Sequence, residues 1–297
     1  MKLAFIGLGA MGLPMAKQLI AAGHEVTGFD VNDRQLEHFT TAGGKAAKTA
    51  LEAARDQSLL ILMVVNAEQI SDLLVTQSLA DVLNKDAIVI SCSTVSAKFA
   101  QAFEAQLETQ GLHFIDAPVS GGVVGAQSGS LSIMASGKMA HFEAVKPVLE
   151  TMGKNLYFLG EQCGKGSALK GVNQLLAGVQ LATAAEAMGF AAQNGLDLEQ
   201  VYDIICTSAG MSWMFKDRVP RMLEPEPVVA SAVDIWPKDL GIVLETAKAT
   251  SYPTPIAALV HQLFQMTSNS GWGKEDDSSI VKLYEKLSTS KVKKSGF

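Results

Sequence analysis

Two short segments of the chain combine residue types that exchange protons or bind carboxylates. In the first, Lys170 lies in an otherwise apolar run, Asn173 follows three residues later on the same helix face, and Gln174 is beside it. Burial or a neighbouring cation disfavours the charged form of a lysine, so such an amine can exchange a proton near neutral pH. The alternative is a lysine whose ammonium group reaches solvent, and the spacing alone favours that alternative.

The second segment is Asp116-Ala117-Pro118-Val119-Ser120-Gly121-Gly122, at the end of a predicted strand. Ser120 supplies a hydroxyl group, and Gly121 and Gly122 leave backbone N–H groups unshielded by side chains. Together these groups make a good cradle for a carboxylate. A flexible glycine loop without a ligand explains the same residues equally well.

A glycine-rich turn near the start of the chain has the spacing of a dinucleotide pyrophosphate site. It follows the apolar run Leu3–Ile6 and precedes a helix-like segment from Met15 to Ala22. In such turns the first glycine permits a tight bend, the second lets the backbone approach the phosphates, and the third lets the helix pack against the strand. A bare glycine motif is weak evidence, but here the flanking strand and helix are in the right order. The predicted cofactor-binding residues are Gly7, Leu8, Gly9, Ala10, Met11 and Gly12.

Asp30 closes the next apolar run and bears on which dinucleotide is bound. A carboxylate at this point accepts hydrogen bonds from both ribose hydroxyls and repels a 2′-phosphate, which favours NAD over NADP. Arg34 weakens this preference because it is able to pair with a phosphate. An ordinary turn residue before Asn32 is the alternative role of Asp30. With NAD as cofactor, a lysine such as Lys170 would protonate a carbonyl oxygen during reduction, or take the proton of an alcohol during oxidation.

The first half of the chain alternates strand-like and helix-like segments. This alternation predicts an α/β fold with a mostly parallel, doubly wound Rossmann-type sheet. The capping-box sequence Thr49-Ala50-Leu51-Glu52 predicts a short helix in the same region. The predicted strands are 2–6, 25–30, 59–65, 87–91, 113–116 and 130–135, and the helices between them include 33–41, 68–75 and 97–110.

From about Gly164 the pattern becomes helical. Residues 169–193 form a long, alanine-rich, apolar segment without proline, typical of a buried helix of about 35 Å or more. Shorter helices are predicted at 198–206, 213–222, 238–250 and 256–268, separated by proline pairs. We expect an NAD-binding domain over 1–163, a long interdomain helix over 164–193, and an all-α domain for substrate binding and oligomerisation over 194–297. The site is expected in the cleft between the domains.

Composition argues against several other classes of protein. A net charge of −6 over 297 residues argues against a general nucleic-acid binder. Cys92, Cys163 and Cys206 are widely spaced, which suits a reducing compartment and neither a zinc site nor a disulfide framework. The sequence suggests no cationic leader and no uninterrupted apolar stretch of membrane-spanning length. We expect a cytoplasmic protein without a metal site or a nucleic-acid or membrane partner.

These segments, in this order, resemble the β-hydroxyacid dehydrogenase family, to which the 3-hydroxyisobutyrate dehydrogenases belong. The likeness extends from Lys2 to about Leu287. It implies an NAD-dependent oxidoreductase acting on a small hydroxy acid, in a homodimer or homotetramer. The implied catalytic residues are Lys170, Ser120 and Asn173, and the implied substrate-binding residues are Ser120, Gly121, Gly122, Asn173 and Gln174. Some members have two asparagines where this chain has Asn173-Gln174, so which amide contacts the substrate stays open.

The resemblance also implies cofactor contacts outside the glycine turn. Thr94 matches a residue near the nicotinamide, and Lys238 matches a cofactor-contacting lysine. Val64 and Val65 match a cofactor-lining segment, although many members have a proline nearby and this chain does not.

Within the family, the L-threonate dehydrogenase branch is the most similar, on segments 63–69, 173–178, 212–215 and 231–235. The expected reaction is the oxidation of L-threonate to 2-dehydro-L-erythronate, with Lys170 as general acid/base and Ser212 as a candidate partner for a further substrate hydroxyl. The alternatives are a 3-hydroxyisobutyrate dehydrogenase or tartronate semialdehyde reductase of the same family. A non-catalytic NAD-binding interaction module is a remote alternative, which the presence of Lys170 disfavours.

Overall fold

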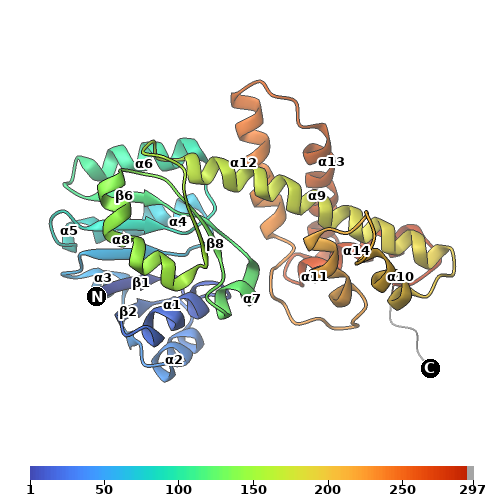
Figure 1. Cartoon of the computed structure of the whole chain (residues 1–297), viewed down its shortest axis with the longest axis horizontal. Coiled ribbons are helices and arrows are strands. Elements are labelled where there is room, and N and C mark those ends of the chain that lie inside the picture. Colours follow the sequence, from blue (N-terminus) through green and yellow to red (C-terminus); the bar gives the residue numbers. More distant parts are fainter. Residues whose placement is uncertain (293–297) are drawn as a thin grey trace. The chain divides into compact units, whose positions relative to one another are not determined.

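The computed structural model describes residues 1–292, which fold into two compact units. The first unit extends from Met1 to Lys170, and the second begins at Gly171. Figure 1 shows the first unit in blue to green and the second in yellow to red.

A six-stranded parallel sheet is the centre of the first unit. Its strands lie in the order β3-β2-β1-β4-β5-β6, and every neighbouring pair is parallel. The order reverses between β1 and β4, which is the switch point where sheets of this kind bind ligands. The predicted doubly wound, Rossmann-type sheet is thus confirmed. The strands are β1 (Lys2–Ile6), β2 (Glu25–Phe29), β3 (Lys45–Ala46), β4 (Leu59–Leu62), β5 (Ile88–Ser91) and β6 (His113–Asp116).

Helices cover both faces of this sheet because alternate strand residues point to opposite sides. Leu3 and Phe5 of β1 belong to one apolar core, and Ala4 and Ile6 belong to the other. The first core is covered by α1 (Gly12–Ala21), α2 (Asp33–Thr41), α7 (Gly122–Gln127) and α8 (Met139–Met152). The second is covered by α3 (Ala50–Ala54), α4 (Ala67–Ser71) with its π-helical continuation Asp72–Thr76, α5 (Leu79–Val82) and α6 (Ala97–Glu108).

A small second sheet follows the main one in the chain. It contains β7 (Val119–Ser120), β8 (Ser132–Ala135) and β9 (Asn155–Phe158), with β7 antiparallel and β9 parallel to β8. The predicted strand at 130–135 is therefore confirmed as a strand but is not part of the parallel sheet. The bridge between Asp116 and Ser136 joins β6 to the end of β8.

The second unit is helical, as predicted. Helix α9 (Lys165–Gln193) matches the predicted long helix, and the isolated Ala232–Asp276 bridge is the one β-type pairing within residues 171–292. Leu181, Met188 and Trp236 are among the residues of its apolar core. The other helices are α10 (Leu198–Ile205), α11 (Trp213–Met222), α12 (Ile235–Ala249), α13 (Pro255–Thr267) with a π-helical continuation Ser268–Trp272, the 3₁₀-helix Asp277–Ile280, and α14 (Val281–Leu287).

By length and composition, helix α9 is apolar enough to cross a membrane. Lys170 and Glu186 interrupt its apolar residues, so it contains no uninterrupted apolar stretch of that length, as the sequence analysis expected. Within its most apolar window, 44% of the residues are buried inside the protein, and Leu181, Ala185 and Met188 lie in the core of the second unit. The apolar side chains in the C-terminal half of α9 therefore form part of the core of the second unit.

A buried ion-pair network joins three elements of the second unit. Arg218 of α11 donates to Asp277 with two of its three guanidinium nitrogens, Nε to Oδ1 at 2.7 Å and Nη2 to Oδ2 at 3.1 Å. The indole N–H of Trp236 in α12 donates to the same carboxylate at 3.0 Å. Burial raises the pKa of Asp277, while the Arg218 guanidinium opposes that rise. The Asp277 carboxylate is thus paired within the second unit, and we assign it a structural role.

Candidate active site

The predicted pyrophosphate loop lies between β1 and α1, and its glycines have different roles. Gly7 has φ +92°, and a Cβ at this position would lie 2.3 Å from the carbonyl oxygen of Met63. A Cβ at Gly12 would lie 1.8 Å from the carbonyl oxygen of Gly7. Close backbone packing therefore requires both glycines. A Cβ at Gly9, in contrast, would meet no heavy atom within 4 Å, so the loop has the open approach that a pyrophosphate needs.

Asp30 follows β2 and contacts the same loop. Its Oδ2 accepts a hydrogen bond from the backbone N–H of Leu8 at 2.6 Å, and its Oδ1 accepts one from Asn32 at 2.8 Å. Asn32 in turn caps α2 by accepting from the backbone N–H of Arg34 at 3.0 Å. Asp30 is therefore both a turn residue and an ordering group for the glycine loop. A carboxylate has about four acceptor sites, so these two bonds leave capacity for ribose hydroxyls.

The predicted cofactor-lining segment after β4 is held by two side chains. The backbone N–H of Val64 donates to Ser93 Oγ at 3.0 Å, and that of Val65 donates to Gln69 Oε1 at 2.8 Å. Ser93 is 1% exposed and comes directly before Thr94 in the loop that follows β5. Ser93 therefore connects the loops after two adjacent strands. Sequence reasoning missed this role, because no local pattern marks a serine that bonds 29 residues away.

Four of these predicted residues follow successive strands of the parallel sheet. Gly7 follows β1, Asp30 follows β2, Val64 comes soon after β4, and Thr94 comes soon after β5. Because the carboxyl ends of parallel strands meet at one edge, these loops lie along the same edge of the sheet. The open space at Gly9 and the carboxylate at the end of β2 fit a nicotinamide dinucleotide bound across that edge.

The Ser120 segment is a strand-to-helix turn. Ser120 is half-buried, ends β7 and pairs with Ser132 of β8. Gly121 and Gly122 have φ values of +129° and +61°, a backbone region that favours glycine. The turn is thus an ordered part of the small sheet and α7. Its two glycines are explained by backbone conformation before any ligand is considered.

Lys170 lies one turn into α9 and is only 7% exposed. This burial argues against the alternative in which its side chain extends freely into solvent. Ser167, one turn earlier, is 3% exposed and bonds the carboxylate of Asp116, its N–H to Oδ2 at 2.8 Å and its Oγ to Oδ1 at 2.7 Å. Asp116 was part of the sequence motif around Ser120, but sequence reasoning gave it no role. Burial raises its pKa to about 6, and hydrogen bonds from Ser167, Ser136 and Gly164 oppose that rise.

The amide pair Asn173-Gln174 belongs to a hydrogen-bonded chain in the second unit. Asn173 Nδ2 donates to Gln174 Oε1 at 2.9 Å, and Gln174 Nε2 donates to Asp239 Oδ2. The other oxygen of Asp239 pairs with Lys238 Nζ at 2.8 Å. Gln174 and Asp239 are buried, at 8% and 3% exposure. Three of the predicted site residues, Asn173, Gln174 and Lys238, are thus joined through Asp239, a residue to which the sequence analysis gave no role.

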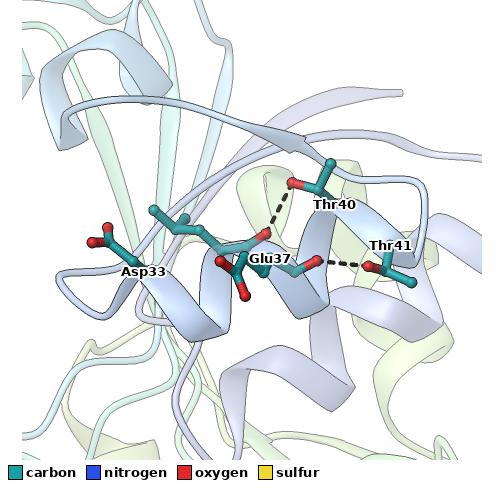
Figure 2. Close-up of a pocket in the computed structure, with 5 residues that line it drawn as sticks. Asp33, Glu37, Thr40 and Thr41 are labelled. Atoms are coloured by element: carbon teal, nitrogen blue, oxygen red, sulfur yellow. Dashed lines mark hydrogen bonds between the residues drawn. The ribbon is translucent and has the colours of Figure 1, made fainter.

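Two other features have structural roles. Ser212, the candidate partner for a substrate hydroxyl, caps α11 by accepting a hydrogen bond from the backbone N–H of Phe215 at 3.0 Å. A surface depression along α2 is lined by Asp33, Leu36, Glu37, Thr40 and Thr41. Figure 2 shows the hydroxyls of Thr40 and Thr41 donating to backbone carbonyls of the same helix, each at 2.9 Å. The depression therefore offers acidic side chains and no basic group to a substrate acid.

The parallel sheet, its glycine turn and Asp30, followed by a helical second unit, define a Rossmann-type nicotinamide-dependent oxidoreductase. The family model described as "NAD binding domain of 6-phosphogluconate dehydrogenase" matches residues 2–160. The model described as "NAD-binding of NADP-dependent 3-hydroxyisobutyrate dehydrogenase" matches residues 164–284. The chain belongs to the β-hydroxyacid dehydrogenase family that includes the 3-hydroxyisobutyrate dehydrogenases, which confirms the resemblance and the expected enzyme class.

Relatives cover nearly the whole chain. L-threonate dehydrogenase of Pectobacterium atrosepticum is 41% identical over 95% of this chain and 93% of its own. L-threonate dehydrogenase of Cupriavidus necator is 41% identical over 94% of each chain. The crystal structure of a 3-hydroxyisobutyrate dehydrogenase from Salmonella typhimurium is 40% identical, with a TM-score of 0.90 over 95% of this chain and 99% of that one. These similarities extend over both units of the chain.

Proposed function

We propose that this enzyme oxidises L-threonate to 2-dehydro-L-erythronate with NAD. The observation that carries the proposal is the similarity to L-threonate dehydrogenases of several bacteria, which is 41% identity over nearly the full length of the two named above. The substrate class, a small hydroxy acid, follows from the family. The particular acid is the proposed part, because a pocket can change its substrate through few side chains.

We assign the proton transfer to Lys170. Its Nζ takes the proton of the C2 hydroxyl while the C2–H bond breaks, so the carbinol becomes a carbonyl and the lysine becomes an ammonium group. Bound NAD supplies the two-electron acceptor for this step. Burial of Lys170 keeps water away from the transferred proton. The reverse transfer, from the ammonium group to a carbonyl oxygen, would serve reduction.

The Ser120 turn is assigned to the substrate carboxylate. Its hydroxyl and the N–H groups of Gly121 and Gly122 would hold the carboxylate and so fix C2 relative to Lys170. Asn173 is assigned to the substrate and to Lys170, since the two residues are three apart on α9. Gln174 is assigned to holding Asn173, because its amide oxygen accepts from Asn173 and its amide nitrogen donates to Asp239. Lys238, paired with Asp239, keeps the cofactor-contacting role that the resemblance implies.

Asp30 supports NAD as the preferred form of the cofactor. Its carboxylate is fixed by the N–H groups of Leu8 and Asn32, so it cannot easily turn away from a ribose in this position. A 2′-phosphate would bring two or more negative charges against that carboxylate. Replacing Asp30 with alanine should therefore lower the ratio of the KM for NADP to the KM for NAD.

The substrate assignment is tested by initial rates on a panel. Purified enzyme is assayed with NAD or NADP and L-threonate, D-threonate, L-erythronate or 3-hydroxyisobutyrate, and with NADH and tartronate semialdehyde. We expect the highest kcat/KM for L-threonate with NAD. A higher value for 3-hydroxyisobutyrate or for tartronate semialdehyde would replace the proposed substrate with that one while leaving the family unaffected.

We further propose a cytoplasmic homodimer or homotetramer. The three cysteines are free thiols, as expected in a reducing compartment. Several large apolar side chains are exposed on the second unit, including Phe190 of α9 and Ile256 and Leu259 of α13, at 72%, 62% and 64%. Apolar side chains in such number favour burial against another copy. Light scattering should give two or four times the chain mass, and a monomer at micromolar concentration would contradict this assembly.

A further inference from the structure

Asp116 is a buried carboxyl group that the proposed reaction does not use. It ends β6, is 0% exposed, and lies four residues before Ser120. Its oxygens accept hydrogen bonds from the N–H and the hydroxyl of Ser167, at 2.8 and 2.7 Å, and from the hydroxyl of Ser136 at 3.2 Å. A backbone hydrogen bond from Gly164 adds to these. A buried carboxylate is costly unless such partners satisfy it, and here most of them come from the beginning of α9.

These bonds cap α9 from a distant part of the chain. The first N–H groups of a helix have no partner within it, and a negative charge stabilises that end. Within α9, the N–H of Ala168 bonds back to the carbonyl of Gly164 at 2.9 Å. The N–H of Ser167 bonds Asp116 directly, and that of Gly166 bonds Ser136 Oγ at 3.0 Å, which donates to Asp116. The start of α9 is thus held by β6 and by the residue after β8.

The glycines at the start of α9 permit this close approach. A Cβ at Gly166 would lie 2.2 Å from the carbonyl oxygen of Met134 and 3.0 Å from Asp116 Oδ2. Gly164 has φ +89°, and a Cβ there would lie 2.6 Å from the carbonyl oxygen of Ala97. Gly166 therefore permits the close contact with Asp116, and Gly164 permits the close contact with Ala97. The end of the helix that would attract a phosphate is occupied by a carboxylate of the protein itself.

The anchored turn leads directly to the proposed proton carrier. Lys170 lies three residues after Ser167, so the two share a helix face and are separated by about 4.5 Å along the axis. Asp116 itself lies four residues before Ser120. Its backbone exchanges two hydrogen bonds with the backbone of Ser136, at 3.0 and 2.8 Å. The segment with the proposed carboxylate-binding turn and the helix with the proposed lysine therefore meet at Asp116.

We propose that Asp116 is a positioning residue, whose carboxylate fixes the first turn of α9 and thereby sets Lys170 relative to the Ser120 turn. The proposal rests on the role assigned to Lys170. It differs from a purely structural cap in one respect: losing the carboxylate must impair the chemical step more than it impairs cofactor binding or folding. A positional error of about 1 Å at a catalytic group costs on the order of 100-fold in rate.

The test uses the full-length Asp116→Asn variant, which keeps the side-chain shape and replaces one acceptor oxygen with a donor. With the hydroxy acid that the wild type oxidises fastest, we expect kcat to fall at least tenfold. The KM and the Kd for NAD should change less than twofold. Hydrogen–deuterium exchange should increase in the peptide containing residues 164–170 and stay unchanged in α6. Because exchange needs no substrate, it tests the anchor even if the enzyme proves inactive on every acid in the panel.

Two further variants separate positioning from general destabilisation. Ser167→Ala keeps its N–H bond to Asp116 and loses the hydroxyl bond, so we expect a smaller fall in kcat that is not additive with Asp116→Asn. Thr49→Ala removes the side-chain cap of α3, which accepts from Glu52 at 3.1 Å, and should lower stability without changing kcat. The proposal is overturned if Asp116→Asn leaves kcat within twofold, leaves exchange at 164–170 unchanged, or impairs NAD binding as much as turnover.

Discussion

Lys170 combines burial with a position one turn from a fixed helix end, and both properties bear on its proposed chemistry. It is 7% exposed, and Ser167, one turn before it, is held by two hydrogen bonds to Asp116. A lysine in this setting has few orientations and little competing water, which is what an acid–base group requires. The sequence identified the residue but could not distinguish this state from a solvated lysine, because burial is decided by elements far along the chain.

Replacing Lys170 with alanine is the direct test of that role. The variant lacks the amine that receives the hydroxyl proton, so we expect kcat to fall by about 10²–10⁴-fold. The affinity for NAD, measured by fluorescence titration, should stay within about twofold. Lys165→Ala, at an exposed position of the same helix, is the matched control and should keep wild-type turnover. Turnover near the wild-type rate in Lys170→Ala would exclude the lysine as the proton carrier.

At the scale of elements, the loop between β1 and α1 shows how one motif contains two kinds of glycine. Gly7 and Gly12 are required by the fold, since a Cβ at either would lie within 2.3 Å of a backbone oxygen. Gly9 has open space around it. A methyl group at Gly9 should therefore leave the fold intact and obstruct only what binds beside the loop.

The Gly9→Ala variant tests whether a methyl group at this position obstructs NAD binding. We expect the KM for NAD to rise at least tenfold, equivalent to about 1.4 kcal/mol of lost binding, with an unchanged melting temperature. Gly210→Ala, at another glycine with room for a methyl group, should affect neither quantity. Wild-type affinity for NAD in Gly9→Ala would mean that the pyrophosphate does not approach the loop at this residue.

The elements that the sequence predicted well are those with strong local signals. The apolar runs at β1, β2, β4, β5 and β6 and the long apolar run at α9 indicate their structures without tertiary information. The strands β3 and β7 contain two residues each, too few to show a period, and β9 alternates between exposed and half-buried residues. The long helix α8 includes Pro147, a residue that disfavours helix in a sequence-based interpretation.

The candidate site divides in the same way. The glycine turn, Asp30, the Ser120 segment and Lys170 are visible in the sequence because each combines residue type with local spacing. Ser93, Asp116 and Asp239 act through bonds to residues 29, 51 and 65 positions away. No local pattern encodes such distances, so these supporting residues appear only once the chain has folded.

For the whole molecule, Asp116 predicts a pH dependence of stability with a definite sign. Its pKa is raised by burial from the usual 3.8 to about 6, so the folded state binds its proton more tightly than the unfolded state does. The resulting stabilisation is fully present below pH 3.8 and is lost as pH rises through about 6. The ionised form that accepts the bonds from α9 at neutral pH is thus the form that is less favourable for folding.

Comparing the wild type with Asp116→Asn isolates this effect, because the other titrating groups are common to both proteins. As pH falls from 7.5 to 5, the unfolding free energy of the wild type should rise relative to the variant by about 1 kcal/mol, on the order of one pKa unit. Denaturant midpoints at the two pH values give the difference. Cys92 and Cys163 stay protonated throughout this pH range because burial raises the pKa of both thiols, and Asp116 is the smallest of four causes that shift the pKa of Glu104. A relative change of opposite sign would contradict the raised pKa.

The first turn of α9 also limits how these enzymes can be recombined. A chimera joined near residue 160, where the match to the first family model ends, would take the groups that satisfy Asp116 from a different parent than Asp116 itself. The Asp116 carboxyl group would then face the first turn of α9 from another enzyme. A fragment that ends near residue 160 would lack these donors entirely. A junction after Lys170, where the first compact unit ends, keeps the donors and the acceptor together. When second units are exchanged to alter substrate choice, a junction inside α9 should therefore give folded chimeras more often than a junction in the loop before α9.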